Sequence, residues 1–332
     1  MDSILVIRYS ALGDVVLATS VLDPLRERFP GARIEWVTAP AYAPLLEGLP
    51  GVAAVHRMEH GGIRAAARLG RSLRGRFDLA VDLQNKVKSA VVARSAAPRR
   101  IVFRRRTARQ AALALVGLDR PRTGSHATEL YADALRPVGI TRPGKMQVHL
   151  SAQARSDATA ALAGAAHPRV AIAPGASQAT KRWPAERFAE VARSVAAAGA
   201  SVVLAGGPSD RPALDAFARA CRVPVAADLT ALPVGALAAA LAEVELLVAC
   251  DSGPVHLASA VGTPTLAIFG PTSAERWGPA APGRVISLSL ACAPCSNHGG
   301  ARCPERHHRC MLDLEAGAVT AAALEMIAAA TR

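Results

Sequence analysis

The sequence lacks both a membrane-spanning segment and a secretion signal. No apolar run reaches the roughly 18 residues needed to cross a bilayer before a charge or turn residue interrupts it. The amino terminus, MDSILVIRYS, has an acid at position 2 and neither the basic region nor the cleavage site of a signal peptide. We therefore expect a cytoplasmic protein.

Aromatic residues are scarce, at 4% of the chain, and they are few where positive charge is concentrated. Between Arg64 and Arg122, sixteen Lys and Arg stand against three acids, and the aromatics are Phe77 and Phe103. Base-stacking platforms for single strands need aromatic side chains, and no helix-turn-helix or zinc-finger spacing accompanies the charge. We expect this basic segment to face an anionic glycolipid or membrane surface rather than nucleic acid. The alternative is a set of solvated arginines from an arginine-rich genome.

Three common nucleotide and acyl-transfer signatures are absent. There is no G-x-x-x-x-G-K-[ST], which excludes a P-loop. The turn after the first expected strand, RYSALGD, has one glycine instead of G-x-G-x-x-G, which argues against an NAD-binding unit. No G-x-S-x-G nucleophile elbow is present.

Strands and helices alternate along both halves of the 332 residues, which is typical of doubly wound parallel sheets in two domains. We place the domains at 1–145 and 146–332, with a linker at 137–144 and a cleft between the halves. The final helix, 315–330, belongs to the second half or packs back on the first. The expected strands are 4–7, 32–37, 53–57, 78–83, 100–103, 169–173, 201–205, 225–228, 246–249 and 265–269.

The most informative stretch runs from Val248 to Thr272, as a buried strand, a turn at D-S-G, an apolar helix and a second buried strand. Ser252 is placed to cap the helix, and Pro254 suits its first turn. The start of such a helix is an anion site, and Asp251 and His256 add a carboxylate and an imidazole beside it. The alternative is a capped turn with an exposed Asp and a partly buried His.

Two further turns of the second half carry polar residues, at 175–181 and 206–210. With the helix start, Lys181 fits the phosphates of a nucleoside diphosphate and Asp210 fits its ribose. The competing interpretations are a solvated loop lysine and a helix-capping aspartate.

In the first half, Asp14 follows the first strand and is a candidate general base for an acceptor hydroxyl. The alternative is an acid that stabilises the helix dipole. Gly13 lets the backbone pass close to a ligand, and polar residues follow the 78–83 strand. The expected acceptor-side residues are Ser10, Gly13, Gln84, Asn85 and Lys88.

Five blocks together resemble glycosyltransferase family 9, the lipopolysaccharide heptosyltransferases, which have the GT-B fold of two Rossmann-like α/β domains. The blocks are IRYSALGD (7–14), DLQNKVKS (82–89), PGASQATKRWP (174–184), LAGGPSD (204–210) and DSGPVHLASAVGTPTLAIFGPT (251–272).

The resemblance implies an inverting transfer of L-glycero-D-manno-heptose from ADP-heptose to the inner core of lipopolysaccharide. The acceptor is then Kdo-lipid A or an already heptosylated core, and contact with the inner membrane is peripheral, on its cytoplasmic face. No metal or other cofactor is implied. Asp14 matches the base and Lys181 the phosphate ligand. Asp251, Ser252, Gly253 and His256 match the diphosphate and sugar motif, and Asp210 and Leu232 fall near the ribose and adenine positions.

Other functions stay open at this point. One is a transferase that uses another nucleotide sugar, and another is a nucleotide-sugar-binding protein without turnover. A GT-B epimerase is disfavoured because the blocks match the transferases.

A carboxy-terminal group, Cys292-x2-Cys295-x7-Cys303-x6-Cys310 with His298, His307 and His308, remains outside these assignments. Its spacing is not that of a zinc ribbon, which has two close pairs. A structural zinc and reduced thiols packed in a loop are the two interpretations, of which we favour the second.

Overall fold

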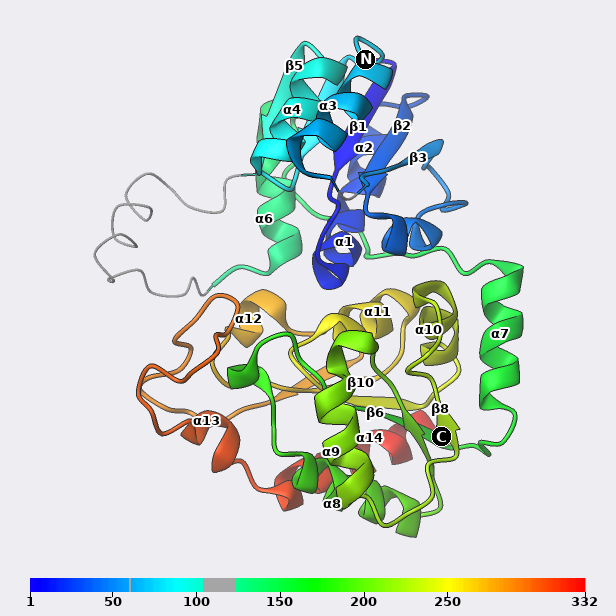
Figure 1. The fold of residues 1–332 in the computed structure, drawn as a ribbon, viewed down its shortest axis with the longest axis vertical. Helices are drawn as coiled ribbons and strands as arrows, with labels where there is room; N and C mark the ends of the chain where they lie inside the picture. Colours follow the sequence, from blue (N-terminus) through cyan, green and yellow to red (C-terminus); the bar gives the residue numbers. More distant parts are fainter. Residues whose placement is uncertain (60, 104–123, 332) are drawn as a thin grey trace. The chain divides into compact units, whose positions relative to one another are not determined.

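The computed structural model describes residues 1–59, 61–103 and 124–331, and the chain divides into two compact units. Of the described residues, the first contains those up to 103 and Ser125–Ser151, and the second contains Gly124 and 152–331. Each unit has its own parallel sheet (Figure 1). Residues 104–122 of the predicted basic segment lie outside the described residues. No helix in the described part of the chain is long and apolar enough to cross a membrane.

The first unit is built on a five-stranded parallel sheet in the order β3-β2-β1-β4-β5. The central strand is buried because every residue from Ile4 to Ile7 is apolar and fully covered, as expected where helices pack on both faces. The strands are β1 Ser3–Ile7, β2 Arg33–Thr38, β3 Ala54–Arg57, β4 Leu79–Asp82 and β5 Arg99–Val102. The helices, with 3-10 helices labelled η, are α1 Leu12–Ala18, η1 Thr19–Val21, α2 Leu22–Arg28, η2 Pro40–Leu45, α3 Gly62–Ser72, α4 Val87–Ala96, α6 Ala127–Ala134 and η3 Arg136–Val138.

The helical segment after β1 is broken into α1, η1 and α2, whereas the sequence pattern predicts one helix over 15–29. Pro24 has no N–H to donate to the carbonyl of Ser20, so an α-helical hydrogen bond is missing at this point. The N–H of Gly144 donates to that carbonyl instead, at 2.8 Å. The predicted linker is thereby fastened to the first unit.

The second unit has a six-stranded parallel sheet in the order β11-β10-β9-β6-β7-β8. The strands are β6 Arg169–Ala173, β7 Ser201–Leu204, β8 Ala227–Asp228, β9 Leu246–Cys250, β10 Thr265–Ile268 and β11 Gly283–Ile286. The helices are α7 Ala152–Leu162, η4 Ala179–Lys181, α8 Ala185–Ala197, η5 Pro208–Asp210, α9 Arg211–Ala220, α10 Val234–Leu241, α11 Gly253–Val261, α12 Ala274–Trp277, α13 Arg309–Leu312 and α14 Ala316–Ala330.

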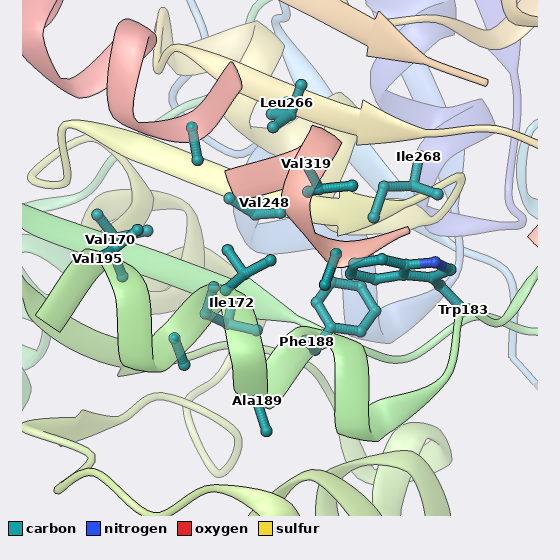
Figure 2. Close-up of a cluster of buried hydrophobic side chains, with 14 of the residues drawn as sticks. Val170, Ile172, Trp183, Phe188, Ala189, Val195, Val248, Leu266, Ile268 and Val319 are labelled. Atoms are coloured by element: carbon teal, nitrogen blue, oxygen red, sulfur yellow. The ribbon is translucent and has the colours of Figure 1, made fainter. Parts of the chain in front are cut away.

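Figure 2 shows a core cluster of the second unit, on one face of this sheet. Val170 and Ile172 of β6 point to the same face because side chains alternate along a strand. Trp183 and Phe188 pack edge to face with ring centroids 4.9 Å apart. The final helix α14 belongs to this unit and adds Val319 to the cluster.

Candidate active site

The polar residues predicted from the sequence lie where the strand order of each sheet reverses. In the first unit β1 is flanked by β2 and β4, and in the second unit β6 is flanked by β7 and β9. The loops that leave adjacent strands diverge at such a point, and open α/β sheets bind their ligands there. Asp14 follows β1 and Gln84 follows β4, whereas Lys181 follows β6 and Asp251 follows β9.

In the first unit, Asp14 is the third residue of α1 and is held by contacts from three segments. Arg8 Nη2 lies 2.6 Å from Asp14 Oδ1, and the Tyr131 hydroxyl of α6 donates to the same oxygen at 3.3 Å. The backbone N–H of Ala11 donates to Oδ2 at 3.3 Å. This last bond is local to the start of the helix, whereas Oδ1 is bound by two residues outside the helix.

Arg8 is a fully buried cation that the sequence pattern did not reveal. Its Nη1 donates to the carbonyl of Leu83, at the end of the neighbouring strand β4. Burial acts to lower the pKa of Arg8, but the neighbouring Tyr131, Asp14 and Asp82 raise it above its ordinary value. The guanidinium therefore stays charged beside Asp14. A charged residue directly after an apolar strand was the available signal.

The structure joins Gln84 and Ser10, two of the predicted acceptor-side residues. Gln84 is buried, and its Oε1 accepts from the backbone N–H groups of Tyr9 and Ser10 at 3.1 and 3.3 Å. Its Nε2 donates to Ser10 Oγ at 3.4 Å. Gln84 thus fixes the turn that leads to Asp14, which is a positioning contact.

The other predicted acceptor-side residues lie in the same two turns. Gly13 is half-buried in the first turn of α1, Asn85 is exposed with a left-handed φ of 49°, and Lys88 is half-buried at the start of α4. The Asn85 N–H donates to Asp82 Oδ1 at 2.8 Å, and the other Asp82 oxygen lies 2.5 Å from Arg100 Nη2. Asp82 and Arg100 therefore hold the turn that presents Asn85 and Lys88.

In the second unit, Lys181 and Asp251 meet in a buried ion pair. Lys181 Nζ lies 3.3 Å from Asp251 Oδ2, and the two residues are 8% and 6% exposed. Thr272, after β10, donates its hydroxyl to the same oxygen at 2.7 Å. The alternatives of a solvated lysine and an exposed aspartate are therefore both wrong. Thr272 was not predicted as a site residue.

The predicted cap by Ser252 is wrong in its chemistry. Ser252 occupies the N-cap position of α11 with an extended backbone, but its hydroxyl donates to the carbonyl of Cys250 at 3.0 Å. The side chain makes no capping bond to the helix, so it does not occupy the N–H groups of the first turn. The Gly253 N–H and the helix dipole are compatible with the predicted anion site. His256 is buried in the same turn, at 4% exposed.

Asp210 packs directly over the turn that follows β6. A Cβ on Gly175 would lie 2.3 Å from Asp210 Cγ, so only glycine fits at position 175. Asp210 Oδ2 accepts from the N–H of Gly207 at 3.0 Å, which is the local capping contact expected as the alternative. Leu232 is half-buried in the turn after β8, where its N–H donates to the carbonyl of Leu229 at 3.1 Å.

The loop that carries the Cys and His residues clamps the Lys181 turn. Three hydrogen bonds join Thr180 and Gly300. The Thr180 N–H and hydroxyl donate to the Gly300 carbonyl at 3.1 and 3.0 Å, and the Gly300 N–H donates to Thr180 Oγ1 at 2.8 Å. A Cβ on Gly299 would lie 2.7 Å from Lys181 Cγ. His308 Nε2 bonds to the carbonyl of Thr180 at 2.8 Å. The loop therefore sets where the Lys181 stem lies.

The four cysteines of this loop are free in the structure. Burial raises the pKa of Cys310 to about 11, and the neighbouring Cys295, Cys303 and Cys292 contribute to the increase. Cys292 Sγ lies 3.9 Å from His307 Nε2. Within the described residues, no three His, Cys, Asp or Glu side chains are arranged to hold a metal ion.

The comparison with known proteins identifies the family. Residues 66–305 match the model of glycosyltransferase family 9 (heptosyltransferase). The chain belongs to this family. Four of the five sequence blocks lie within the match, and the block at 7–14 precedes it. The protein is therefore a glycosyltransferase.

Individual relatives agree over most of the chain. Lipopolysaccharide heptosyltransferase 3 of Escherichia coli is 27% identical over 285 residues, which are 80% of this chain and 83% of that protein. A family 9 glycosyltransferase structure from Veillonella parvula superposes with a TM-score of 0.84 at 22% identity, over 98% of each chain. The E. coli ADP-heptose lipopolysaccharide heptosyltransferase II structure gives 0.77 at 24% identity, over 100% of each chain. These structures confirm the predicted GT-B fold.

Proposed function

We propose that the protein transfers L-glycero-D-manno-heptose from ADP-heptose to the inner core of lipopolysaccharide, with inversion at the sugar carbon. The observation that carries the proposal is the Lys181–Asp251 pair beside the start of α11 in a family 9 chain. The second unit is the donor-binding domain and the first is the acceptor-binding domain.

The donor diphosphate binds at the start of α11. Backbone N–H groups at Ser252 and Gly253 and the positive end of the helix dipole face it. Lys181 adds a cation whose stem is held by the loop at Gly299. These groups neutralise the charge that develops on the departing ADP, so the reaction needs no metal or other cofactor.

The remaining donor contacts follow from the turns around α11. Asp251 and His256 lie in the turn and the first helical turn, where they bind hydroxyls of the donor sugar. Asp210 Oδ1 accepts from the ribose, because Oδ2 is engaged by Gly207. Leu232 packs against the adenine.

Asp14 is the general base, and Oδ2 is its reacting oxygen. Oδ1 carries the 2.6 Å ion pair with Arg8 and the bond from the Tyr131 hydroxyl, whereas Oδ2 accepts from the Ala11 N–H at 3.3 Å. The acceptor hydroxyl oxygen attacks the sugar carbon as the bond to the ADP oxygen breaks, and its proton passes to Oδ2. One displacement inverts the carbon and forms no covalent intermediate with the enzyme.

The acceptor is the Kdo of Kdo-lipid A, or the first heptose of a core that already carries one. Ser10, Gly13, Gln84, Asn85 and Lys88 belong to its side of the reaction. A glycolipid acceptor also places the enzyme at a membrane surface, as a peripheral protein. The basic helix α3 supports this, because its Arg64, Arg68 and Arg71 are all exposed.

The test is ADP release from ADP-heptose in EDTA, with and without Kdo2-lipid A, by the wild type and Asp14→Asn. We expect acceptor-dependent release by the wild type and a loss of roughly 10²- to 10⁴-fold in the variant. The affinity for ADP should be the same in both proteins. Release that needs a divalent ion would contradict the mechanism. ADP-heptose binding without release on Kdo2-lipid A or a heptosylated acceptor would favour a nucleotide-sugar-binding protein.

A second candidate is a transferase that uses another nucleotide sugar. The buried Asp251 and His256 are chemically suited to hydroxyls of hexoses as well as heptoses. Assays that offer GDP- or UDP-hexoses together with ADP-heptose separate the two candidates. The measured quantity is which nucleotide sugar is consumed, because only the correct donor should be turned over.

A further inference from the structure

A cavity of about 550 Å³ lies beside the Lys181 turn, and none of the roles proposed above uses it. Its walls come from the η4 turn at Ala179 and Thr180 and from the loop that continues through Arg302, Cys303 and Arg306 to His308. Its volume is within the range of small-molecule sites. It lies wholly within the second unit.

The charge of this cavity is positive. Arg302 and Arg306 both line it and are both exposed, and in the described part of the chain neither guanidinium is paired with a carboxylate. Glu305 lies between them in sequence but is not part of the wall. A guanidinium presents a planar fork that matches the oxygens of a carboxylate or a phosphate. Two such groups at one opening favour an anionic ligand.

The backbone that forms the cavity is held in an uncommon conformation. Arg306 and His308 have left-handed φ angles of 59° and 50°, although neither is glycine. Such residues persist only where the surrounding contacts determine them, and they concentrate at ligand sites. Here the bond from His308 Nε2 to the Thr180 carbonyl, at 2.8 Å, supplies one such contact. The arginines are thereby presented from a fixed loop.

We infer that this cavity binds a sugar that carries a carboxylate or a phosphate. The cavity is larger than a bare anion, so it has room for a sugar ring. The site also gives the Cys and His loop a role besides clamping Lys181.

The binding test uses the full chain and four probes, which are free Kdo, glucose 6-phosphate, glucose and inorganic phosphate. We expect calorimetric titration to show binding of the two charged sugars and none of glucose. Arg302→Gln with Arg306→Gln should weaken that binding roughly 10- to 100-fold, because each lost charged hydrogen bond is worth about 1.5 kcal/mol or more. Affinity for ADP should not change, which shows that the variant is folded.

Arg309→Gln is the matched control. Arg309 is exposed in the same region, but it is paired with Asp313 at 2.6 Å and does not line the cavity. Its loss should leave sugar binding unchanged. Equal weakening by the control and the double variant would overturn the inference, because the effect would then be one of net charge. Wild-type binding by the double variant, or inorganic phosphate binding as tightly as the sugars, would also overturn it.

Discussion

At the residue scale, the Lys181–Asp251 pair says more about the ligand site than about the stability of the protein. A buried ion pair is weak evidence for stability, because desolvation offsets much of the attraction. Removing one partner, however, leaves a buried charge and costs about 3–5 kcal/mol. Thr272 supplies a further bond to the carboxylate at 2.7 Å. The arrangement therefore fixes an ammonium group next to the helix start, which is what a diphosphate site requires.

Tyr131 gives a mild test of how Asp14 is positioned. Tyr131→Phe removes the hydroxyl that lies 3.3 Å from Asp14 Oδ1 and keeps the ring, which packs edge to face on Phe103 at 4.9 Å. We expect kcat to fall roughly 3- to 10-fold, as for the loss of one hydrogen bond of about 1 kcal/mol. The KM for ADP-heptose should not change.

The pH profile of kcat distinguishes positioning from a general loss of stability. If the hydroxyl orients the base, the acidic limb of the profile should move in Tyr131→Phe, while the thermal unfolding midpoint stays close to that of the wild type. A lower midpoint with an unmoved profile would show that Tyr131 only supports the packing of α6.

Asp14, Lys181 and Asp251 could be found from sequence because each follows a predicted strand. In a parallel sheet, such positions converge at one edge. Tyr131 could not be found this way, because its contact with Asp14 joins residues 117 apart in sequence and nothing local in TELYAD encodes it. Arg8 does follow a predicted strand, but the sequence does not show that it is buried beside Asp14. The bond from Ser252 to Cys250 was likewise hidden, because a serine at an N-cap position normally bonds the helix.

At the element scale, the sequence pattern missed strand β11, which is short and partly exposed. β11, Gly283–Ile286, has two exposed and two half-buried residues at the edge of the sheet, so its apolar signal is weak. The buried strands β6 and β9 were placed closely because their apolar runs end at polar turns. The break at Pro24 was readable, but its outcome depended on Gly144, which is distant in sequence.

The contact of the Cys and His loop with the Lys181 turn is testable through one glycine. Gly299 has a φ of +77°, and a Cβ there would lie 2.7 Å from Lys181 Cγ and 3.0 Å from Gln178 Cβ. Gly299→Ala should therefore displace the lysine stem and weaken ADP binding by roughly 10-fold, the size of one charged hydrogen bond. Titration with ADP measures the effect.

Gly199→Ala is the control for backbone strain alone. Gly199 has a φ of +92°, and a Cβ at this position would meet no atom within 4 Å. The two variants therefore share the left-handed cost of about 1–2 kcal/mol. Both should lower the unfolding midpoint, and only Gly299→Ala should lower ADP affinity. Equal affinities for ADP in the two variants would show that the loop does not position Lys181.

At the scale of the whole molecule, the alternation of strands and helices was sufficient to predict two doubly wound sheets, and the family comparison confirms the fold. The alternation of strands and helices does not show where exposed apolar side chains lie next to basic ones. Ile63 and Val87 are among the exposed large apolar side chains of the described residues, at 58% and 66%. Each adjoins basic residues in sequence, Arg64 for the first and Lys86 and Lys88 for the second. Exposed apolar groups beside cations are typical of proteins that bind anionic membranes.

Membrane binding through a localised basic surface and membrane binding through net charge alone predict different effects of mutation. The formal charge is +13, so any anionic vesicle will attract the protein to some degree. If α3 makes the contact, changing Arg64, Arg68 and Arg71 together to Gln should weaken binding to phosphatidylglycerol vesicles by roughly 10- to 100-fold, at up to about 1 kcal/mol for each charge. Vesicle co-sedimentation over a range of salt concentrations measures the change.

The control removes the same charge from the second unit. Arg155, Arg193 and Arg219 are exposed on α7, α8 and α9, and their joint change to Gln also lowers the net charge by three. Vesicle binding should then be close to that of the wild type, and ADP affinity should be unchanged in both triple variants. Equal losses of vesicle binding would assign the attraction to net charge and leave α3 without a special role. A loss confined to the α3 variant would place the contact on the unit that carries Asp14, because screening by salt acts on both variants alike.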